Sequence, residues 1–180
     1  KIFGNHGLRG FDVHELPTFG GSLRIFFCHE ASDRPVEPSV EAVRKLEKDA
    51  GYDQIEVYAA YNEAVKASKR RMLEFLVEAK DAGKSIVGYG APAKGNTLLN
   101  YCGVGNDFLD YVVDKSPHKQ DHFLPGVHVP VFDPEMIRET RPDYVIILVW
   151  NIKDEIIAQF PDIGEWGGKF VVLIPDVEVL

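Results

Sequence analysis

The stretch that decides the fold is IVGYGAPAKGNTLLNY, residues 86–101. Its apolar start predicts a buried strand, and a helical pattern follows with Pro92 in the first turn. Between them, residues 88–93 fit the fingerprint G-x-G-x-x-G/A, which belongs at such a strand-to-helix turn. This arrangement presents the free N–H groups at the start of a helix to a phosphate.

The small residues of this loop have distinct predicted roles. Gly88 permits the tight turn, Gly90 lets a phosphate approach the backbone, and Ala93 keeps the helix close to the strand. Lys94 stands in the first helical turn, where the helix dipole disfavours a positive charge. A bound anion would offset that charge. A glycine-rich turn with a purely structural role is the alternative.

Strand and helix patterns alternate after Gly83. We predict strands over 84–90, 108–114, 142–151 and 167–175, and helices over 91–103, 134–140 and 152–160. Alternation of this kind indicates parallel strands joined by crossover helices. The predicted fold is therefore an α/β, Rossmann-like domain whose mostly parallel sheet has helices on both faces.

An N-terminal strand and two helices are predicted before this domain. The strand covers 22–27, and the helices cover 38–50 and about 53–82. The chain begins with lysine and not methionine, so we expect it to be a piece of a longer protein. We assign residues 1–36 to a strand and linker from a preceding domain, and residues 37–180 to the Rossmann-like domain.

Composition excludes several classes of protein. Apolar residues make up 45% of the chain and charged residues 27%, as in a globular protein. The formal charge of −8 argues against nucleic acid as a partner. No apolar run reaches the roughly 20 residues that cross a bilayer, and no signal peptide opens the chain, so we expect a cytoplasmic protein with no membrane partner. Cys28 and Cys102 have no ligand or redox spacing and are predicted to be reduced and structural.

Asp114 ends the second predicted strand, 24 residues after Gly90. An acid at this place binds the adenosine ribose in dinucleotide enzymes, so spacing alone favours an NAD(P)-dependent oxidoreductase. Pro92 and Lys94 are atypical of that loop, however, and no obvious proton relay accompanies it. A Walker A loop is excluded because Lys94 precedes Gly95 instead of following a glycine. A nucleotide- or CoA-sensing module is a further alternative.

Two other groups of residues are candidates for a site. His118, His122 and His128 share one loop, but their spacing matches no strong metal-ligand pattern, and we expect no metal site. Trp150 and Asn151 stand at the carboxyl end of the third predicted strand. Ligands of such sheets sit at the carboxyl ends of the strands, so this pair is predicted to face the same crevice as the glycine loop.

Four blocks of sequence resemble the C-terminal domain of S-adenosylmethionine-dependent sugar C-methyltransferases, which act on nucleotide-linked deoxysugars. The resemblance reaches back to ELPTFGGSLRIFF, residues 15–27, and so covers nearly the whole chain. The four blocks are GYGAPAKGNTLLNYCGV, VDKSPHKQDHFLPGVHVPV, RPDYVIILVWNIKDEI and GGKFVVLIP.

The resemblance implies a division of labour along a longer polypeptide. In this family, a zinc domain and a methyltransferase domain that binds S-adenosylmethionine come first, and the C-terminal domain binds the nucleotide sugar. This chain would then bind no cofactor itself. It would position a dTDP-linked keto-deoxysugar, with the preceding methyltransferase domain as its partner.

The resemblance also implies a set of substrate-binding residues. The glycine loop would lie against the diphosphate, the segment after the second strand would border the base or ribose, and two further pairs would complete the crevice. These residues are Gly88, Tyr89, Gly90, Ala91, Pro92, Ala93, Lys94, Gly95 and Asn96 in the loop, then Asp114, Lys115, Ser116, Pro117 and Lys119, and finally Pro125, Gly126, Trp150 and Asn151.

One position departs from the family pattern. The family commonly has a histidine in THGGSLR, where this chain has Phe19. If that position serves the sugar or an interdomain contact, this homologue differs in substrate or activity. A domain with a vestigial pocket, which only stabilises its neighbour, is the corresponding alternative.

Overall fold

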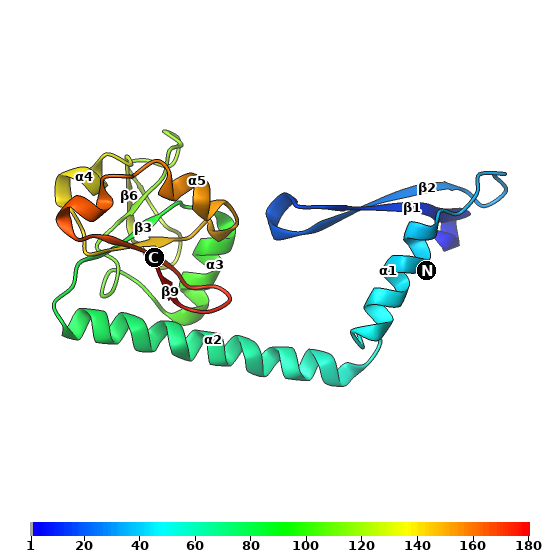
Figure 1. The fold of residues 1–180 in the computed structure, drawn as a ribbon, viewed down its shortest axis with the longest axis horizontal. Helices are drawn as coiled ribbons and strands as arrows, with labels where there is room; N and C mark the ends of the chain where they lie inside the picture. Colours follow the sequence, from blue (N-terminus) through cyan, green and yellow to red (C-terminus); the bar gives the residue numbers. More distant parts are fainter. Residues whose placement is uncertain (1) are drawn as a thin grey trace. The chain divides into compact units, whose positions relative to one another are not determined.

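The computed structural model describes residues 2–180. These residues form two compact units whose boundary, between Glu63 and Ala64, lies within one long helix. Figure 1 shows the order of the elements along the chain. Each unit is described by itself.

The first unit is built on a two-stranded antiparallel sheet. Strand β1 (Leu8–Leu16) pairs with β2 (Ser22–His29), and a short 3-10 turn joins them. The sequence predicted only the second of these strands. The first was missed because a bulge between Gly10 and Asp12 interrupts its alternation of side chains.

Two helices follow the hairpin. Helix α1 (Pro38–Asp49) begins with its proline in the first turn, as predicted. Helix α2 (Ile55–Asp81) continues into the second unit, and Gly83 follows its end with φ +70°. Of residues 2–63, only the side chain of Val40 is buried.

The second unit contains a seven-stranded sheet in the order β5-β6-β4-β3-β7-β8-β9. The five inner strands are parallel, and the two edge strands are antiparallel to their neighbours. The inner order is that of a Rossmann-like sheet, which confirms the predicted fold class. The strands are β3 (Ile86–Tyr89), β4 (Val112–Val113), β5 (His122–Phe123), β6 (Pro130–Phe132), β7 (Tyr144–Ile147), β8 (Lys169–Val172) and β9 (Glu178–Val179).

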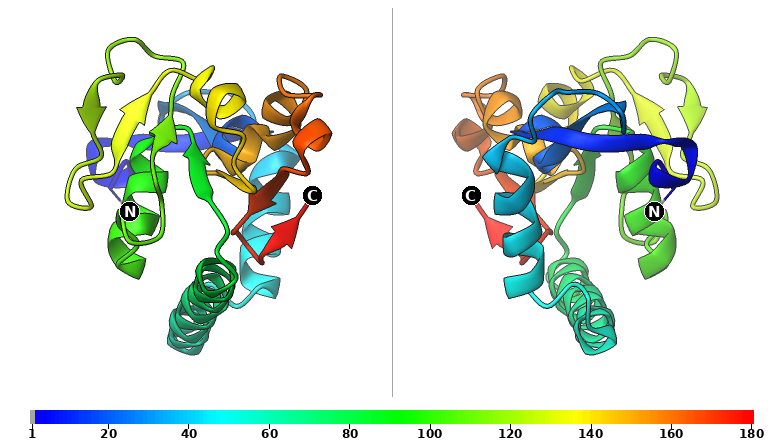
Figure 2. Two further views of the ribbon diagram at one scale, coloured as in Figure 1. Left: turned by 90° about the vertical axis from the view of Figure 1, so that its left-hand side faces the viewer. Right: turned by 90° about the vertical axis from the view of Figure 1, so that its right-hand side faces the viewer.

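Helices cover both faces of this sheet, as Figures 1 and 2 show. On one face, α2 and α3 (Ala93–Cys102) contribute Met72, Leu76 and Leu99 to a core with Ile86 and Ile146. On the other face, α4 (Met136–Thr140) and α5 (Lys153–Ile157) pack over a second core. Successive side chains of a strand point to opposite faces, so an almost wholly apolar strand is buried on both sides.

The remaining elements are short. They are the 3-10 turns η1 (Gly4–His6), η2 (Thr18–Gly20), η3 (Trp150–Ile152) and η4 (Ile163–Trp166). Both cysteines are free, and Cys102 is buried where desolvation raises the pKa of its thiol. In the range 2–180, no helix is long and apolar enough to cross a bilayer.

Candidate functional site

The carboxyl ends of β3, β4 and β7 meet around a cavity of about 340 Å³. In parallel sheets this edge is where ligands bind, because loops that leave neighbouring strands in opposite directions open a crevice there. The cavity is lined by Tyr89, Gly90, Pro92, Asp114, Lys115, Lys119, Val149, Ile152, Glu155, Ile156 and Gln159.

Three glycines let the loop and α3 fit closely against the sheet. A Cβ on Gly88 would lie 2.7 Å from Val112 Cγ1, and one on Gly90, where φ is +92°, would lie 2.2 Å from Val149 Cγ2. At Gly95, a Cβ would lie 2.9 Å from the Cβ of Leu148. All three positions therefore require glycine for close approach, and Gly90 requires it for its backbone conformation as well.

Two details of the predicted loop need correction. Ala93 is exposed, and the buried Gly95 makes the close contact between helix and strand, two residues later than the fingerprint implied. Pro92 is extended (φ −81°, ψ 156°) and lies just before the helix, which begins at Ala93. The start of α3 has no side-chain cap, so its first N–H groups have no partner from a capping side chain.

Asp114 ties the end of β4 to the glycine loop. Its carboxylate accepts hydrogen bonds from the N–H of Ala91 (2.7 Å), the N–H of Ser116 (2.9 Å) and Nζ of Lys119 (3.0 Å). Burial works to raise the pKa of Asp114, but these hydrogen bonds and the Lys119 charge outweigh it and hold the pKa below its ordinary value. Both carboxylate oxygens are therefore engaged within the chain.

Lys94 reaches across the crevice to the end of β7. Its Nζ lies 4.3 Å from the centre of the Trp150 ring and donates a hydrogen bond to Oδ1 of Asn151. Burial lowers the pKa of Lys94. The sequence predicted that the glycine loop and this pair face one crevice. The structure brings Lys94 into contact with both residues, but none of the three lines the cavity itself.

The expected residues after β4 fall into two groups. The side chains of Lys115 and Lys119 line the cavity, whereas Ser116 contributes its backbone to the turn and Pro117 is exposed. Asn96 lies in the second turn of α3, where its Oδ1 accepts a hydrogen bond from Asn100 Nδ2 (3.3 Å), and it does not line the cavity.

Pro125 and Gly126 lie at the other end of the sheet, which corrects the expectation that they complete the crevice. The hairpin of β5 and β6 reverses the chain, so the turn between them lies at the amino end of β6. There Asn100, near the end of α3, donates a hydrogen bond to the Pro125 carbonyl (3.0 Å). A Cβ on Gly126 would lie 2.1 Å from Asn100 Oδ1, so this turn packs against α3.

Sequence reasoning missed the wall of the cavity formed by the α5 region. Ile152, Glu155 and Gln159 line it, and Gln159 Oε1 accepts a hydrogen bond from the buried Tyr89 hydroxyl (2.9 Å). No motif marks these residues. The available signal was their place directly after Asn151, at the carboxyl end of a predicted strand.

Two other predicted features lie away from this cavity. Phe19 stands at the tip of the β1–β2 hairpin with φ +58° and is 88% exposed. Within residues 2–180, no three His, Cys, Asp or Glu side chains are grouped closely enough to hold a metal ion. In the histidine loop, the His122 ring contacts the Gln120 carbonyl through Nδ1, at 2.7 Å.

Comparisons with known proteins bear on the whole chain. A family model described as "C-methyltransferase C-terminal domain" matches residues 17–175. C-methyltransferase NovU from Streptomyces niveus is 36% identical over 182 residues, which cover 99% of this chain and 43% of NovU. The chain thus spans less than half the length of that relative. The structure of UDP-D-quinovosamine 4-dehydrogenase from Vibrio fischeri aligns with a TM-score of 0.39 and 15% sequence identity. The alignment covers 54% of this chain and 93% of that protein's chain, and the likeness is too loose to bear on fold or function.

Proposed function

The chain belongs to the C-methyltransferase C-terminal domain family, as its motifs predicted, and from that premise we propose that it holds a nucleotide-linked sugar for methyl transfer. The substrate would be a dTDP-linked keto-deoxysugar, with its diphosphate at the start of α3. The catalytic steps and the binding of S-adenosylmethionine would belong to the preceding part of the same polypeptide.

The observation that carries this proposal is the position of Lys94. It lies in the first turn of an uncapped helix, two residues after Pro92, which lines the cavity at the carboxyl ends of the strands. Backbone N–H groups at a helix start and an ammonium group together suit a phosphate. Lys115 and Lys119 add positive charge on the β4 side of the same cavity.

The hydrogen bonds of Asp114 favour a nucleotide-linked sugar over a dinucleotide as the ligand. In a dehydrogenase, the acid at this position would offer its carboxylate to the adenosine ribose. Here Asp114 is already engaged by Ala91, Ser116 and Lys119. An NAD(P)-dependent oxidoreductase domain is the second candidate, supported by the strand, loop and helix order, and a nucleotide-sensing module would use the same loop.

The proposed contribution of this domain to the reaction is positioning. The full-length enzyme would remove a proton beside the keto group of the sugar, and the resulting enolate would take the methyl group of S-adenosylmethionine. Holding two reactants in line can supply roughly 7–11 kcal/mol of the barrier. Lys94, Trp150 and Asn151 suit this role because they are fixed against one another at the ends of two strands.

Calorimetric titration of the chain with dTDP tests the proposal, with NAD⁺, NADP⁺ and CoA titrated in parallel. We expect saturable dTDP binding that Lys94→Ala weakens by about 10- to 100-fold, the equivalent of one hydrogen bond to a charged group. Lys169→Ala removes the same charge from an exposed lysine at the amino end of β8 and should leave binding unchanged.

Four results would count against the proposal. Binding of NAD⁺ or NADP⁺ in preference to dTDP would support the dehydrogenase alternative, and preference for CoA would support the sensing module. If dTDP binds neither to this chain nor to the full-length polypeptide, the pocket is vestigial, which is the alternative that Phe19 suggested in the sequence. Equal losses for Lys94→Ala and Lys169→Ala would place the diphosphate elsewhere.

A further inference from the structure

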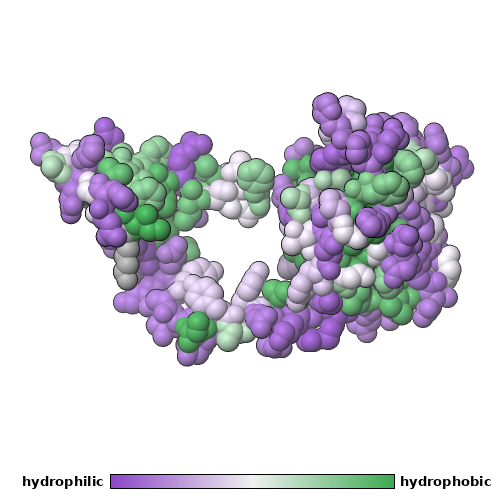
Figure 3. Space-filling model, turned by 180° about the vertical axis from the view of Figure 1, so that it is seen from behind, coloured by the Kyte–Doolittle hydropathy of each residue, from purple (hydrophilic) through white to green (hydrophobic). Residues whose placement is uncertain are grey.

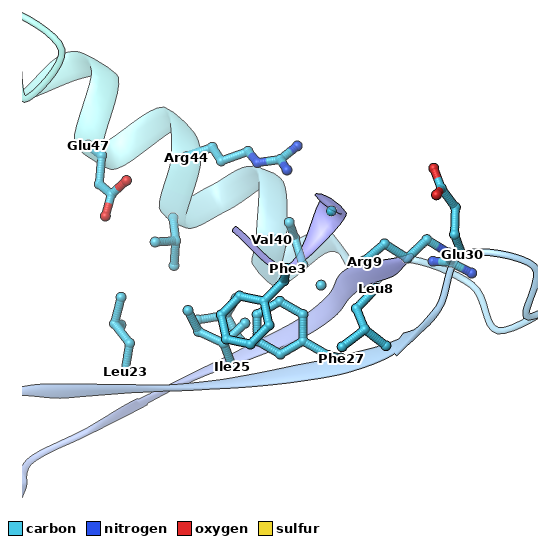
Figure 4. Close-up of a pocket in the computed structure, with 14 residues that line it drawn as sticks. Phe3, Leu8, Arg9, Leu23, Ile25, Phe27, Glu30, Val40, Arg44 and Glu47 are labelled. Atoms are coloured by element: carbon cyan, nitrogen blue, oxygen red, sulfur yellow. The ribbon is translucent and has the colours of Figure 1, made fainter. Parts of the chain in front are cut away.

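Each unit of the chain has a cavity, and the two cavities differ in chemistry. The cavity of the first unit, of about 480 Å³, lies between the hairpin and α1 and is lined mainly by aliphatic and aromatic side chains (Figure 4). Figure 3 shows hydrophobic residues at the surface of this unit as well. The cavity of the second unit combines apolar side chains with polar groups. A few polar groups of fixed orientation are what make a pocket specific for its ligand.

Two hydrogen bonds fix the orientation of the Gln159 amide on the wall of this second cavity. Its Nε2 donates to the carbonyl oxygen of Glu155 (2.7 Å), which can only accept. Oε1 therefore faces the Tyr89 hydroxyl (2.9 Å), and because Oε1 can only accept, the hydroxyl donates. Among the described residues, the second N–H of the Gln159 amide and the lone pairs of the Tyr89 oxygen have no partner. They form an unused donor beside an unused acceptor.

The surroundings of both side chains hold this pair in place. Tyr89 is 5% exposed, and its ring meets the Phe160 ring edge to face, with the ring centres 5.8 Å apart. Arg138 donates a hydrogen bond to the Gln159 carbonyl (2.9 Å), which fixes the backbone that carries the amide. Burial, with a smaller contribution from the Asp114 charge, raises the pKa of Tyr89, so the hydroxyl keeps its proton at neutral pH. The donor and the acceptor are therefore preorganised.

A donor beside an acceptor is complementary to one edge of a nucleobase. Thymine and uracil present their N3–H donor next to a carbonyl acceptor, and proteins read unpaired bases by hydrogen bonds to this edge. Pro92, Val149 and Ile152 line the same cavity and offer apolar surface to the faces of a planar ring. The volume of about 340 Å³ lies within the roughly 300–1,000 Å³ of small-molecule pockets.

The proposed reaction decides which end of the substrate would enter this cavity. The sugar has to reach the methyl donor, which the preceding part of the polypeptide would bind. With the diphosphate at the start of α3, the nucleoside would then lie against the second unit itself. The end of the substrate that faces Tyr89 and Gln159 is therefore the base.

We propose that Tyr89 and Gln159 read the base of the nucleotide sugar. The Tyr89 oxygen accepts a hydrogen bond from N3–H of the thymine, and the free N–H of Gln159 donates to the neighbouring carbonyl oxygen. This inference rests on the proposed function. It assigns the edge of the base to the α5 side of the cavity, whereas the segment after β4 borders the ribose.

Calorimetric titration of the chain with dTDP and with N3-methyl-dTDP tests the proposal, because the methyl group replaces only the N–H donor. We expect N3-methyl-dTDP to bind about 10- to 100-fold more weakly, since a buried acceptor is left without its donor. Tyr89→Phe removes that acceptor, so dTDP should bind this variant more weakly and the difference between the two ligands should disappear. The comparison is a double-mutant cycle between protein and ligand.

Tyr111→Phe is the matched control. Tyr111 is 6% exposed and its hydroxyl donates to the Met136 carbonyl (3.2 Å), but it does not line the cavity. This variant loses a buried hydroxyl as Tyr89→Phe does, and it should keep the full difference between dTDP and N3-methyl-dTDP.

Three results would overturn the proposal. The first is equal binding of dTDP and N3-methyl-dTDP by the unaltered chain, which requires no variant; if Lys94→Ala still weakens dTDP, the proposed function stands without this inference. The second is a difference that persists in Tyr89→Phe. If that difference disappears in Glu155→Ala, the N–H belongs to the Glu155 carboxylate, on the same wall. The third is no dTDP binding by the chain or by the full-length polypeptide, which removes the proposed function as well.

Discussion

Replacement of Gly90 by alanine should destabilise the second unit through two separable effects. The first is conformational, because Gly90 has φ +92°, where an L side chain is strained. The second is steric, because the new Cβ would lie 2.2 Å from Val149 Cγ2, at the end of β7. At that distance a neighbour must move, and Val149 is a β-branched residue with little rotamer freedom.

The two effects have different magnitudes. A non-glycine residue in the left-handed region costs about 1–2 kcal/mol. Forcing one methyl group into a well-packed site costs about 1–3 kcal/mol more. Gly90→Ala should therefore lower the free energy of unfolding by about 2–5 kcal/mol.

Gly103→Ala is a matched control, because Gly103 has φ +75° but nothing lies within 4 Å of a Cβ placed there. It should show the conformational cost alone, about 1–2 kcal/mol. Introducing Val149→Ala removes Cγ2, so in that background Gly90→Ala should cost no more than the control. The difference is the coupling of a double-mutant cycle.

Urea unfolding followed by tryptophan fluorescence provides the measurement. The two tryptophans, Trp150 and Trp166, both lie in the second unit, so the signal reports on that unit. The reasoning is refuted if Gly90→Ala costs no more than Gly103→Ala. It is also refuted if Val149→Ala leaves the cost of Gly90→Ala unchanged.

Two further predictions concern carboxylates. Hydrogen bonds from Lys84 and from a backbone N–H lower the pKa of Asp143 to about 2, so the stability that this carboxylate contributes is present above pH 4 and is lost as the pH falls toward 2. Asp143→Asn should therefore lower the free energy of unfolding by about 1 kcal/mol at neutral pH, after allowance for solvent exposure. It should also flatten the acid limb of a titration of stability against pH, followed by tryptophan fluorescence. Asp114→Ala should lower the free energy of unfolding in urea by about 2–3 kcal/mol, because two backbone N–H groups lose a charged acceptor. Lys119→Ala should lower it by less than about 1 kcal/mol. Equal losses for the two variants would show that the ion pair dominates.

The sequence was sufficient to predict the parallel sheet because its signals are strong and local. Apolar strands alternate with helices, and the glycines at 88 and 90 mark the first crossover. Strands β5, β6 and β9 were missed. β5 and β9 have two exposed residues each, and β6 has three residues and begins with a proline, so none of them carries a clear apolar pattern. Their pairing is decided by neighbours distant in sequence, which a local pattern cannot reveal.

The candidate site was predictable only where a strand end marks it. Asp114, Trp150 and Asn151 follow predicted strands, and the structure places them beside the glycine loop. Pro125 and Gly126 lie in the turn of an antiparallel hairpin that the sequence did not reveal, so the turn was assigned to the wrong end of the sheet. Gln159 was missed because its partner, the Tyr89 hydroxyl, lies 70 residues away along the chain.

The charge of Lys94 shows how the structure changes the reason for expecting a ligand. In the sequence, a lysine in the first turn of a helix suggested a ligand, because the helix dipole disfavours it. In the structure, the Trp150 ring and the side-chain oxygen Oδ1 of Asn151 stabilise the ammonium group within the chain. The dipole argument alone therefore no longer requires an anion. An ammonium group has three donors, however, and Asn151 accepts from one. Lys94 could therefore bind the proposed diphosphate without breaking either contact, and the two residues that stabilise it would also hold it in place for that ligand.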